Sequence, residues 1–392
     1  MNYANKLKEL QAGEGIKRRS FLKAMGFSSL GLGLGLGFGS PLFSKMGKAD
    51  KAEAFEGSAV DWKTDEKGNK YFVPRSIRTD LVNQKGIVMA KVDGTWHKYR
   101  TREFDGEFYD WWLAEKIWYF DQLMAFVEGE AEDMNIPNGG HHHPMISTYG
   151  KKFGSRGDSE FHLNTTAKGF TILPKPENIK KINDELNKVY KTGNVPMDVF
   201  KFKRELYQDR ELWDKTRFGT LELYTGRPIN DHDTSGQFGF TETHTFQNII
   251  ANPIATLTYM SLFNTDGSQT YLEGMPYLTP HFEFRGFCWL ISYYNPDNTK
   301  YEKAIADYIN QSHSKFHGGV SDIIVNIFLV AEEFNNTPGY GPGLGKRVVP
   351  PKEYKEAKTA SIGYQPTEKP GQKKKLAREE RIELIRRLRL PV

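Results

Sequence analysis

Cysteine is almost absent from this chain of 392 residues. Cys288 stands alone, so no disulfide can form within the chain, and no zinc or iron–sulfur site built from several cysteines can form either. Excess positive charge is missing from the body, because residues 55–368 carry 36 Lys and Arg against 42 Asp and Glu. A mildly acidic body predicts that nucleic acid is not a partner.

Long apolar runs are also scarce, and the one candidate lies near the N-terminus. Residues 24–43 are uncharged, but a Gly-Leu repeat makes them a poor helix. They follow Lys17-Arg-Arg-Ser-Phe-Leu-Lys23, and Ala52-Glu-Ala54 then offers a small-x-small cleavage site. The segment resembles a twin-arginine signal peptide, which implies that residues 1–54 export a folded, cofactor-loaded protein to the periplasm or a similar extracytoplasmic space. Retention of the uncleaved segment as a tether, or an ordinary membrane anchor, is the alternative.

The part that follows, residues 55–139, reads as an N-terminal α+β segment. Short apolar runs up to about residue 105 predict strands. Helical spacing of apolar residues predicts a helix from Phe108 to about Met134, and we expect its tryptophans to pack in the core rather than to hold a ligand. Charged, periodic residues at 175–215 predict one or two amphipathic helices.

A regular order of elements spans residues 218–334. Alternating or β-branched runs predict strands over 219–226, 254–261, 281–291 and 322–330. A short helix over 245–252 ends at Asn252-Pro253, because the residue before proline leaves the helical region, and a second helix covers 301–312.

This order, with Tyr224-Thr225, Ala251-Asn-Pro253 and Arg285-Gly286 at the corresponding places, resembles the FMN-binding split barrel of the pyridoxamine 5′-phosphate oxidase-like superfamily. The resemblance implies an α+β fold with a split β-barrel over residues 140–349. It also implies a homodimer with the cofactor between subunits.

The resemblance assigns roles to particular residues. Cofactor contacts would come from six of them, and His244 and His281 would be the catalytic proton donors. The superfamily's Arg-Lys pair is replaced here by His244-Thr245, so Arg227 or Arg285 would have to supply the positive charge for a phosphate. The six cofactor contacts are Tyr224, Thr225, Arg227, Thr243, Thr245 and Arg285.

The leading interpretation is an exported, FMN-dependent oxidoreductase that acts on a small organic substrate, with a deazaflavin as another cofactor the fold accepts. The first alternative is a haem- or metal-binding protein on the same scaffold. It rests on the run His141–His143 and on His313 and His317, which are four residues apart. The second alternative is a cofactor-free accessory subunit of a periplasmic complex.

The C-terminal residues 350–392 form a separate part. A proline-rich linker leads into a basic helix over 373–390. We expect this helix to dock on anionic lipid or on a partner subunit, and a solvated tail is the alternative.

Overall fold

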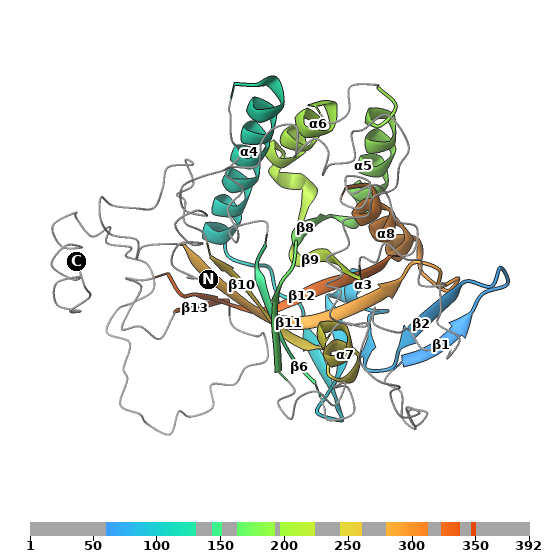
Figure 1. Cartoon of the computed structure of the whole chain (residues 1–392). Helices are drawn as coiled ribbons and strands as arrows, with labels where there is room; N and C mark the ends of the chain where they lie inside the picture. Colours follow the sequence, from blue (N-terminus) through green and yellow to red (C-terminus); the bar gives the residue numbers. More distant parts are fainter. Residues whose placement is uncertain are drawn as a thin grey trace, which may run out of the picture.

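The computed structural model describes residues 60–130, 143–150, 163–192, 197–223, 244–260, 280–312, 323–337 and 346–349. The fold is mixed α+β, and its sheets are antiparallel, as Figure 1 shows. The predicted signal peptide (1–54) and C-terminal segment (350–392) lie outside the described residues. Within the described part, no helix has the length and apolar character needed to cross a membrane.

The N-terminal segment forms two small sheets. A hairpin joins β1 (Val60–Thr64) to β2 (Lys70–Pro74). A second sheet holds β3 (Ile77–Arg78), β4 (Ile87–Val92) and β5 (Thr95–Arg100), with the short helix α3 (Val82–Lys85) between its first two strands. Asp93 and Gly94 both have positive φ, which is the backbone of the tight hairpin turns that favour an Asp-Gly pair.

The main sheet has eight strands in the order β7-β6-β10-β11-β12-β9-β8, and β13 pairs with β12. No pairing between β7 and β8 closes this sheet within the described ranges, so closure into a split barrel stays a prediction. The strands are β6 (Met145–Tyr149), β7 (Leu163–Ala167), β8 (Thr171–Pro174), β9 (Trp213–Leu223), β10 (Ile254–Met260), β11 (His281–Ser292), β12 (Ile324–Asn335) and β13 (Lys346–Val349).

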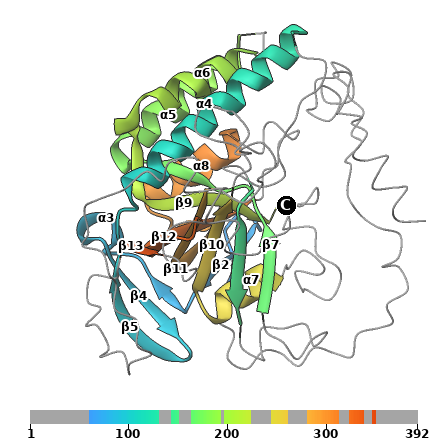
Figure 2. The same cartoon turned by 90° about the vertical axis from the view of Figure 1, so that its left-hand side faces the viewer.

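Four helices gather on one side of the sheet, as Figure 2 shows: α4 (Gly106–Glu128), α5 (Pro176–Val189), α6 (Met197–Gln208) and α8 (Lys300–Ser312). Asp105 caps α4 by accepting from the Glu107 N–H. Gly129, at φ 85°, ends α4 six residues before the predicted boundary near Met134. The 3₁₀ helix η2 (Arg210–Leu212) leads into β9, and α7 (His244–Ala251) leads into β10.

One aromatic core joins these parts. Phe108 of α4 packs against Phe218 of β9 and Phe284 of β11, with ring centroids 5.8 and 4.6 Å away. The expected core role of the α4 tryptophans is confirmed for Trp111 and Trp112, which are buried. The N-terminal segment covers the same sheet, because Tyr99 of β5 lies 4.4 Å from Phe287, centroid to centroid. Residues 55–139 and 140–349 therefore share a core where they are described.

The predicted order of elements from residue 245 onward is confirmed. The helices at 245–252 and 301–312 and the strands at 254–261 and 281–291 appear within a residue or so of their expected bounds. Two strands are longer than predicted: β9 begins at Trp213, and β12 continues to Asn335. Pairing with their neighbours in the sheet supports these extra residues even where the local sequence is polar.

Candidate functional site

One face of the main sheet is exposed over β7, β6, β10 and the first half of β11. Side chains alternate between this face and the core along each strand. Six large apolar side chains are exposed among the described residues, and four of them lie here: Leu163, Met260, Tyr149 and Met145. We call this surface the exposed sheet face. Its residues are Leu163, Thr165, Tyr149, Ser147, Met145, Thr256, Thr258, Met260, His281, Glu283 and Arg285.

His281 is the histidine of this face. It begins β11 and lies directly opposite Met260, the last residue of β10, so the two side chains are cross-strand neighbours. His281 is half-buried, whereas 54% of Met260 is exposed. Burial lowers the pKa of the imidazole, against the opposing effect of the nearby Glu283 carboxylate. The ring is therefore neutral near pH 7, with one nitrogen lone pair able to bind a metal or accept a proton.

Arg285 lies on the same face but is held by carboxylates. Its Nε is 2.7 Å from Glu283 Oε1, and its Nη1 is 3.5 Å from Glu332 Oε1. The guanidinium also lies over the ring of Phe334, 4.3 Å from the centroid. Asn336 Nδ2 donates to the other oxygen of Glu283 at 3.1 Å. These two carboxylates already balance the arginine charge, so it is poorly placed to bind a phosphate.

The predicted phosphate-binding helix, α7, packs on the opposite face of the sheet. Thr245 is buried, and its hydroxyl accepts from Asn164 Nδ2 at 2.8 Å. Asn248 donates to the Thr148 hydroxyl at 3.2 Å. A Cβ on Gly150 would lie 2.2 Å from Asn248 Oδ1, so glycine permits this close approach. The first turn of α7 is therefore committed to holding the helix on β6 and β7.

The predicted site residues do not form one cluster. Tyr224, Thr225, Arg227 and Thr243 lie outside the described residues. His244 and Thr245 begin α7 on one face, while His281 and Arg285 lie on the other. Along β10, Ala255 pairs with Thr148, whose hydroxyl accepts from Asn248 of α7. At the other end of β10, Met260 pairs with His281. The five residue steps from Ala255 to Met260 span about 17 Å. The two proton-donor candidates are thus far apart within one chain, and their catalytic roles stay predictions.

A buried ion pair in the core was not predicted from the sequence. Glu222 of β9 has a fully buried side chain, and Lys168 Nζ lies 2.8 Å from its Oε1. Asn326 Nδ2 donates to the second carboxylate oxygen at 3.3 Å. Burial raises the pKa of the neighbouring Cys288 thiol, with Glu222 adding to the shift, so this cysteine is unreactive.

Two lysines of helices α4 and α6 also lie beside aromatic rings. Lys116 Nζ of α4 is 5.1 Å from the ring centroid of Trp112 and 6.0 Å from that of Tyr207. Lys203 of α6 donates to the Ser312 carbonyl. Burial lowers the pKa of each lysine to about 7. The pKa of His143, just before β6, is lowered by burial and then by Lys116.

Most histidines of the predicted metal alternatives lie outside the described residues. No three His, Cys, Asp or Glu side chains come together to hold a metal ion within the described ranges. His141, His142, His313 and His317 lie outside those ranges. A haem iron can be held by a single histidine, so the absence of a three-residue cluster among the described residues does not bear on haem.

Comparisons with known proteins leave the family open. The chain matches no protein-family model. No curated protein matches it significantly. Among solved structures, the heme storage protein HutZ from Vibrio cholerae aligns with a TM-score of 0.24 and 7% identity, over 50% of this chain and 85% of that one. A likeness this small carries no argument about fold or ligand, so split-barrel membership stays a prediction.

Proposed function

We propose that this protein binds haem on the exposed sheet face, with His281 as the iron ligand. The observation that carries the proposal is the pairing of a neutral, half-buried imidazole with an exposed thioether on an otherwise apolar and hydroxyl-rich surface. Haem iron is commonly held by histidine, and the flat porphyrin needs apolar contacts beside its ligand. When bound, haem would supply the ligand-binding and redox chemistry of its iron.

The neighbouring residues fit such a group. Met260 and Met145 offer polarisable side chains to a porphyrin, and Tyr149 and Leu163 extend the apolar surface. The charged side chains beside His281 would influence where the carboxylates of haem bind. Glu283 and Glu332 surround a single arginine, which leaves one net negative charge there. This negative charge would disfavour binding of a haem propionate beside Arg285.

A second copy of the chain is the natural cover for this surface, and we propose a homodimer. A flat ligand on one open face has only one side in contact with protein. A two-fold pair of exposed sheet faces would enclose both sides and would also bury the four exposed apolar side chains.

Flavin-dependent oxidoreduction, the leading expectation from the sequence, draws less support from the described side chains. Of the predicted cofactor contacts that are described, Thr245 is committed to Asn164 and Arg285 to two carboxylates. These residues do not fit the phosphate of FMN, so we derive no flavin-dependent step. The cofactor-free accessory subunit remains the reading for a protein that binds neither group.

The test is a titration of the purified protein with hemin, followed by the Soret band. His281→Ala should weaken binding at least about 10-fold, because even the outer partners of a metal ligand have effects of that size. It should also change the spectrum of the remaining complex. His97→Ala is the matched control, since His97 is exposed and lies on β5, a strand of a different sheet. It should bind hemin like the unmodified protein.

Three results would overturn the proposal. Hemin binding unchanged by His281→Ala would remove the ligand assignment. Loss of binding on His244→Ala instead would move the site to the α7 side. Tight, stoichiometric binding of FMN, with no specific hemin complex, would return the flavin interpretation.

A further inference from the structure

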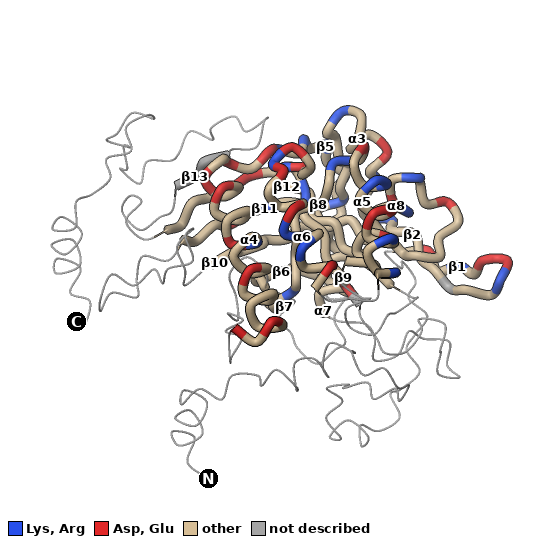
Figure 3. Tube along the Cα trace, turned by 90° about the horizontal axis from the view of Figure 1, so that it is seen from above, with Lys and Arg blue, Asp and Glu red and all other residues tan. Residues whose placement is uncertain are grey.

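The three-stranded sheet β3-β4-β5 carries a cluster of positive charge that the net charge of the chain conceals. Residues 75–102 hold seven Lys and Arg against two Asp and Glu, although the body of the chain is acidic. Val88 and Ala90 are fully buried, and Tyr99 packs on Phe287, which defines the inner face of the sheet. The alternate residues of β3, β4 and β5 point outward. Figure 3 shows Lys and Arg positions along β5.

This outward surface, here called the basic face, also exposes a tryptophan. Trp96 is 37% exposed, and the guanidinium of Arg78 lies 5.0 Å from its ring centroid. Across the ladder, Trp96 pairs with Lys91, and Lys98 pairs with Met89. The cations of the basic face and its adjoining pocket form no ion pair with any described residue. They are Arg78, Lys85, Lys91, Lys98, Arg100 and Arg102.

A pocket of about 290 Å³ continues the basic face at the end of β5. Its lining includes Lys85, Arg100 and Arg102, and Glu103 is its one acidic residue. Thr101 fixes the wall by donating to the Gly86 carbonyl from both its N–H and its hydroxyl. Arg102 Nε is buried and has no hydrogen-bond partner among the described residues. An oxyanion at its side would satisfy that donor.

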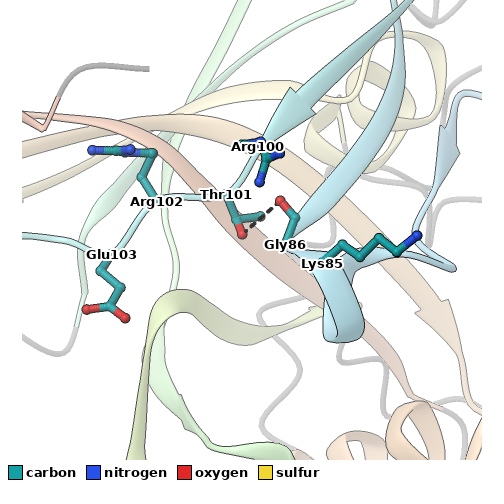
Figure 4. A pocket seen from close by; sticks show the side chains of 6 residues that line it. All are labelled: Lys85, Gly86, Arg100, Thr101, Arg102 and Glu103. Carbon is teal, nitrogen blue, oxygen red and sulfur yellow. Dashed lines mark hydrogen bonds between the residues drawn. The ribbon is translucent and has the colours of Figure 1, made fainter. Parts of the chain in front are cut away.

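The arrangement of these cations indicates what kind of anion they suit. Figure 4 shows Arg100 at the middle of the pocket, with the chains of Lys85 and Arg102 extending to opposite sides. The three charges therefore lie in a row rather than converging on one point. A row of cations matches a surface that carries many phosphates better than a single small anion.

We propose that the basic face docks on an anionic phospholipid surface, with a headgroup phosphate in the pocket beside Arg100 and Trp96 in the lipid interface. Tryptophan is enriched where membrane meets water, and unpaired Lys and Arg are attracted to anionic headgroups. The predicted export signal favours lipid over nucleic acid, which also presents many phosphates. The site is independent of the haem proposal, because it lies on a different sheet.

The test is sedimentation of the full-length protein with vesicles of phosphatidylcholine alone or mixed with phosphatidylglycerol, at low and high salt. We expect binding only to the anionic vesicles, and less of it at high salt. Lys98→Gln with Arg100→Gln should weaken vesicle binding about 25-fold, because each positive charge near the surface contributes roughly fivefold to the affinity. Lys98→Arg with Arg100→Lys should restore it. Lys180→Gln with Lys188→Gln removes the same charge from α5 and should have little effect.

Tryptophan provides a second, independent readout. Brominated phosphatidylglycerol should quench the fluorescence of the unmodified protein, and Trp96→Phe should lower that quenching. The proposal fails if the two glutamines leave vesicle binding unchanged, or if α5 variants weaken it equally. It also fails if neutral vesicles bind as well. Tighter binding to single-stranded DNA than to vesicles, lost in the same glutamine variant, would identify a nucleic-acid site instead. Saturation by inorganic phosphate without vesicle binding would identify a small-anion site.

Discussion

Glu333 makes the stability of this fold depend on pH in a way that one substitution can isolate. The residue lies on β12 and is fully buried. One carboxylate oxygen accepts from the Asp105 N–H at 2.6 Å, while Oε1 is buried without a hydrogen-bond partner in the described part of the chain. Burial raises the pKa of Glu333 to about 8, and the negative charges of Asp105 and Glu107 add to the shift. The carboxyl is therefore mostly protonated in the folded protein at pH 7.

The sign of the effect follows from proton binding. Between about pH 4.5 and 8 the folded state holds a proton on Glu333 that the unfolded state has released. Stability from this group is fully present below pH 4.5 and is lost as the pH rises to 8. The loss amounts to about 1 kcal/mol at pH 5 and about 3 kcal/mol at pH 7.

Glu333→Gln should remove that dependence, because the amide oxygen can still accept from Asp105 and the group no longer titrates. The free energy of unfolding of the variant, relative to the unmodified protein, should rise by about 2–3 kcal/mol between pH 5 and pH 7. Urea unfolding at the two pH values measures it. Glu66→Gln, on the exposed β1–β2 turn, is the control. A constant difference between variant and unmodified protein at both pH values would refute the reasoning.

Three further substitutions test the core. Gly286→Ala should destabilise by about 3 kcal/mol in urea unfolding, because its Cβ would lie 1.9 Å from the Leu329 carbonyl oxygen; no loss would contradict the β11–β12 geometry. Lys116→Met should raise the free energy of unfolding by about 3 kcal/mol more at pH 7 than at pH 10, because only at the higher pH does the unmodified lysine fold neutral at little cost; an equal effect at both would rule out the lowered pKa. Glu222→Leu alone should lower the free energy of unfolding by about 3 kcal/mol, and adding Lys168→Met should recover most of that loss. No recovery in the double variant would contradict a buried ion pair.

Local sequence signals were enough to predict most of the fold from residue 245 onward. Asn252-Pro253 ends α7 because proline restricts the residue before it, and the β-branched run after it forms β10. Gly286 was expected at its place in β11, but the sequence did not reveal why. The register shift beside it, and the close approach of β12, are properties of the pairing between strands.

The candidate site was less accessible to sequence reasoning. Strand alternation places His281 and Arg285 on a common face, but it does not say that α7 packs on the other one. The charge partners are also distant in sequence, as with Arg285 and Glu332, or Lys168 and Glu222. Arg285 was chosen for a phosphate from its position in a motif, but two carboxylates neutralise it: Glu283, two residues away on the same strand, and Glu332, which only the pairing of β11 with β12 brings near.

The visible spectrum of the protein purified from its native host, with an iron determination on the same sample, tests the central claim most directly. Haem on the exposed sheet face predicts a Soret band, iron in proportion to protein, and loss of both in the His281→Ala variant while the fold is retained. Flavin absorbance without iron would contradict the account. So would a colourless protein that forms no Soret-absorbing complex when hemin is added.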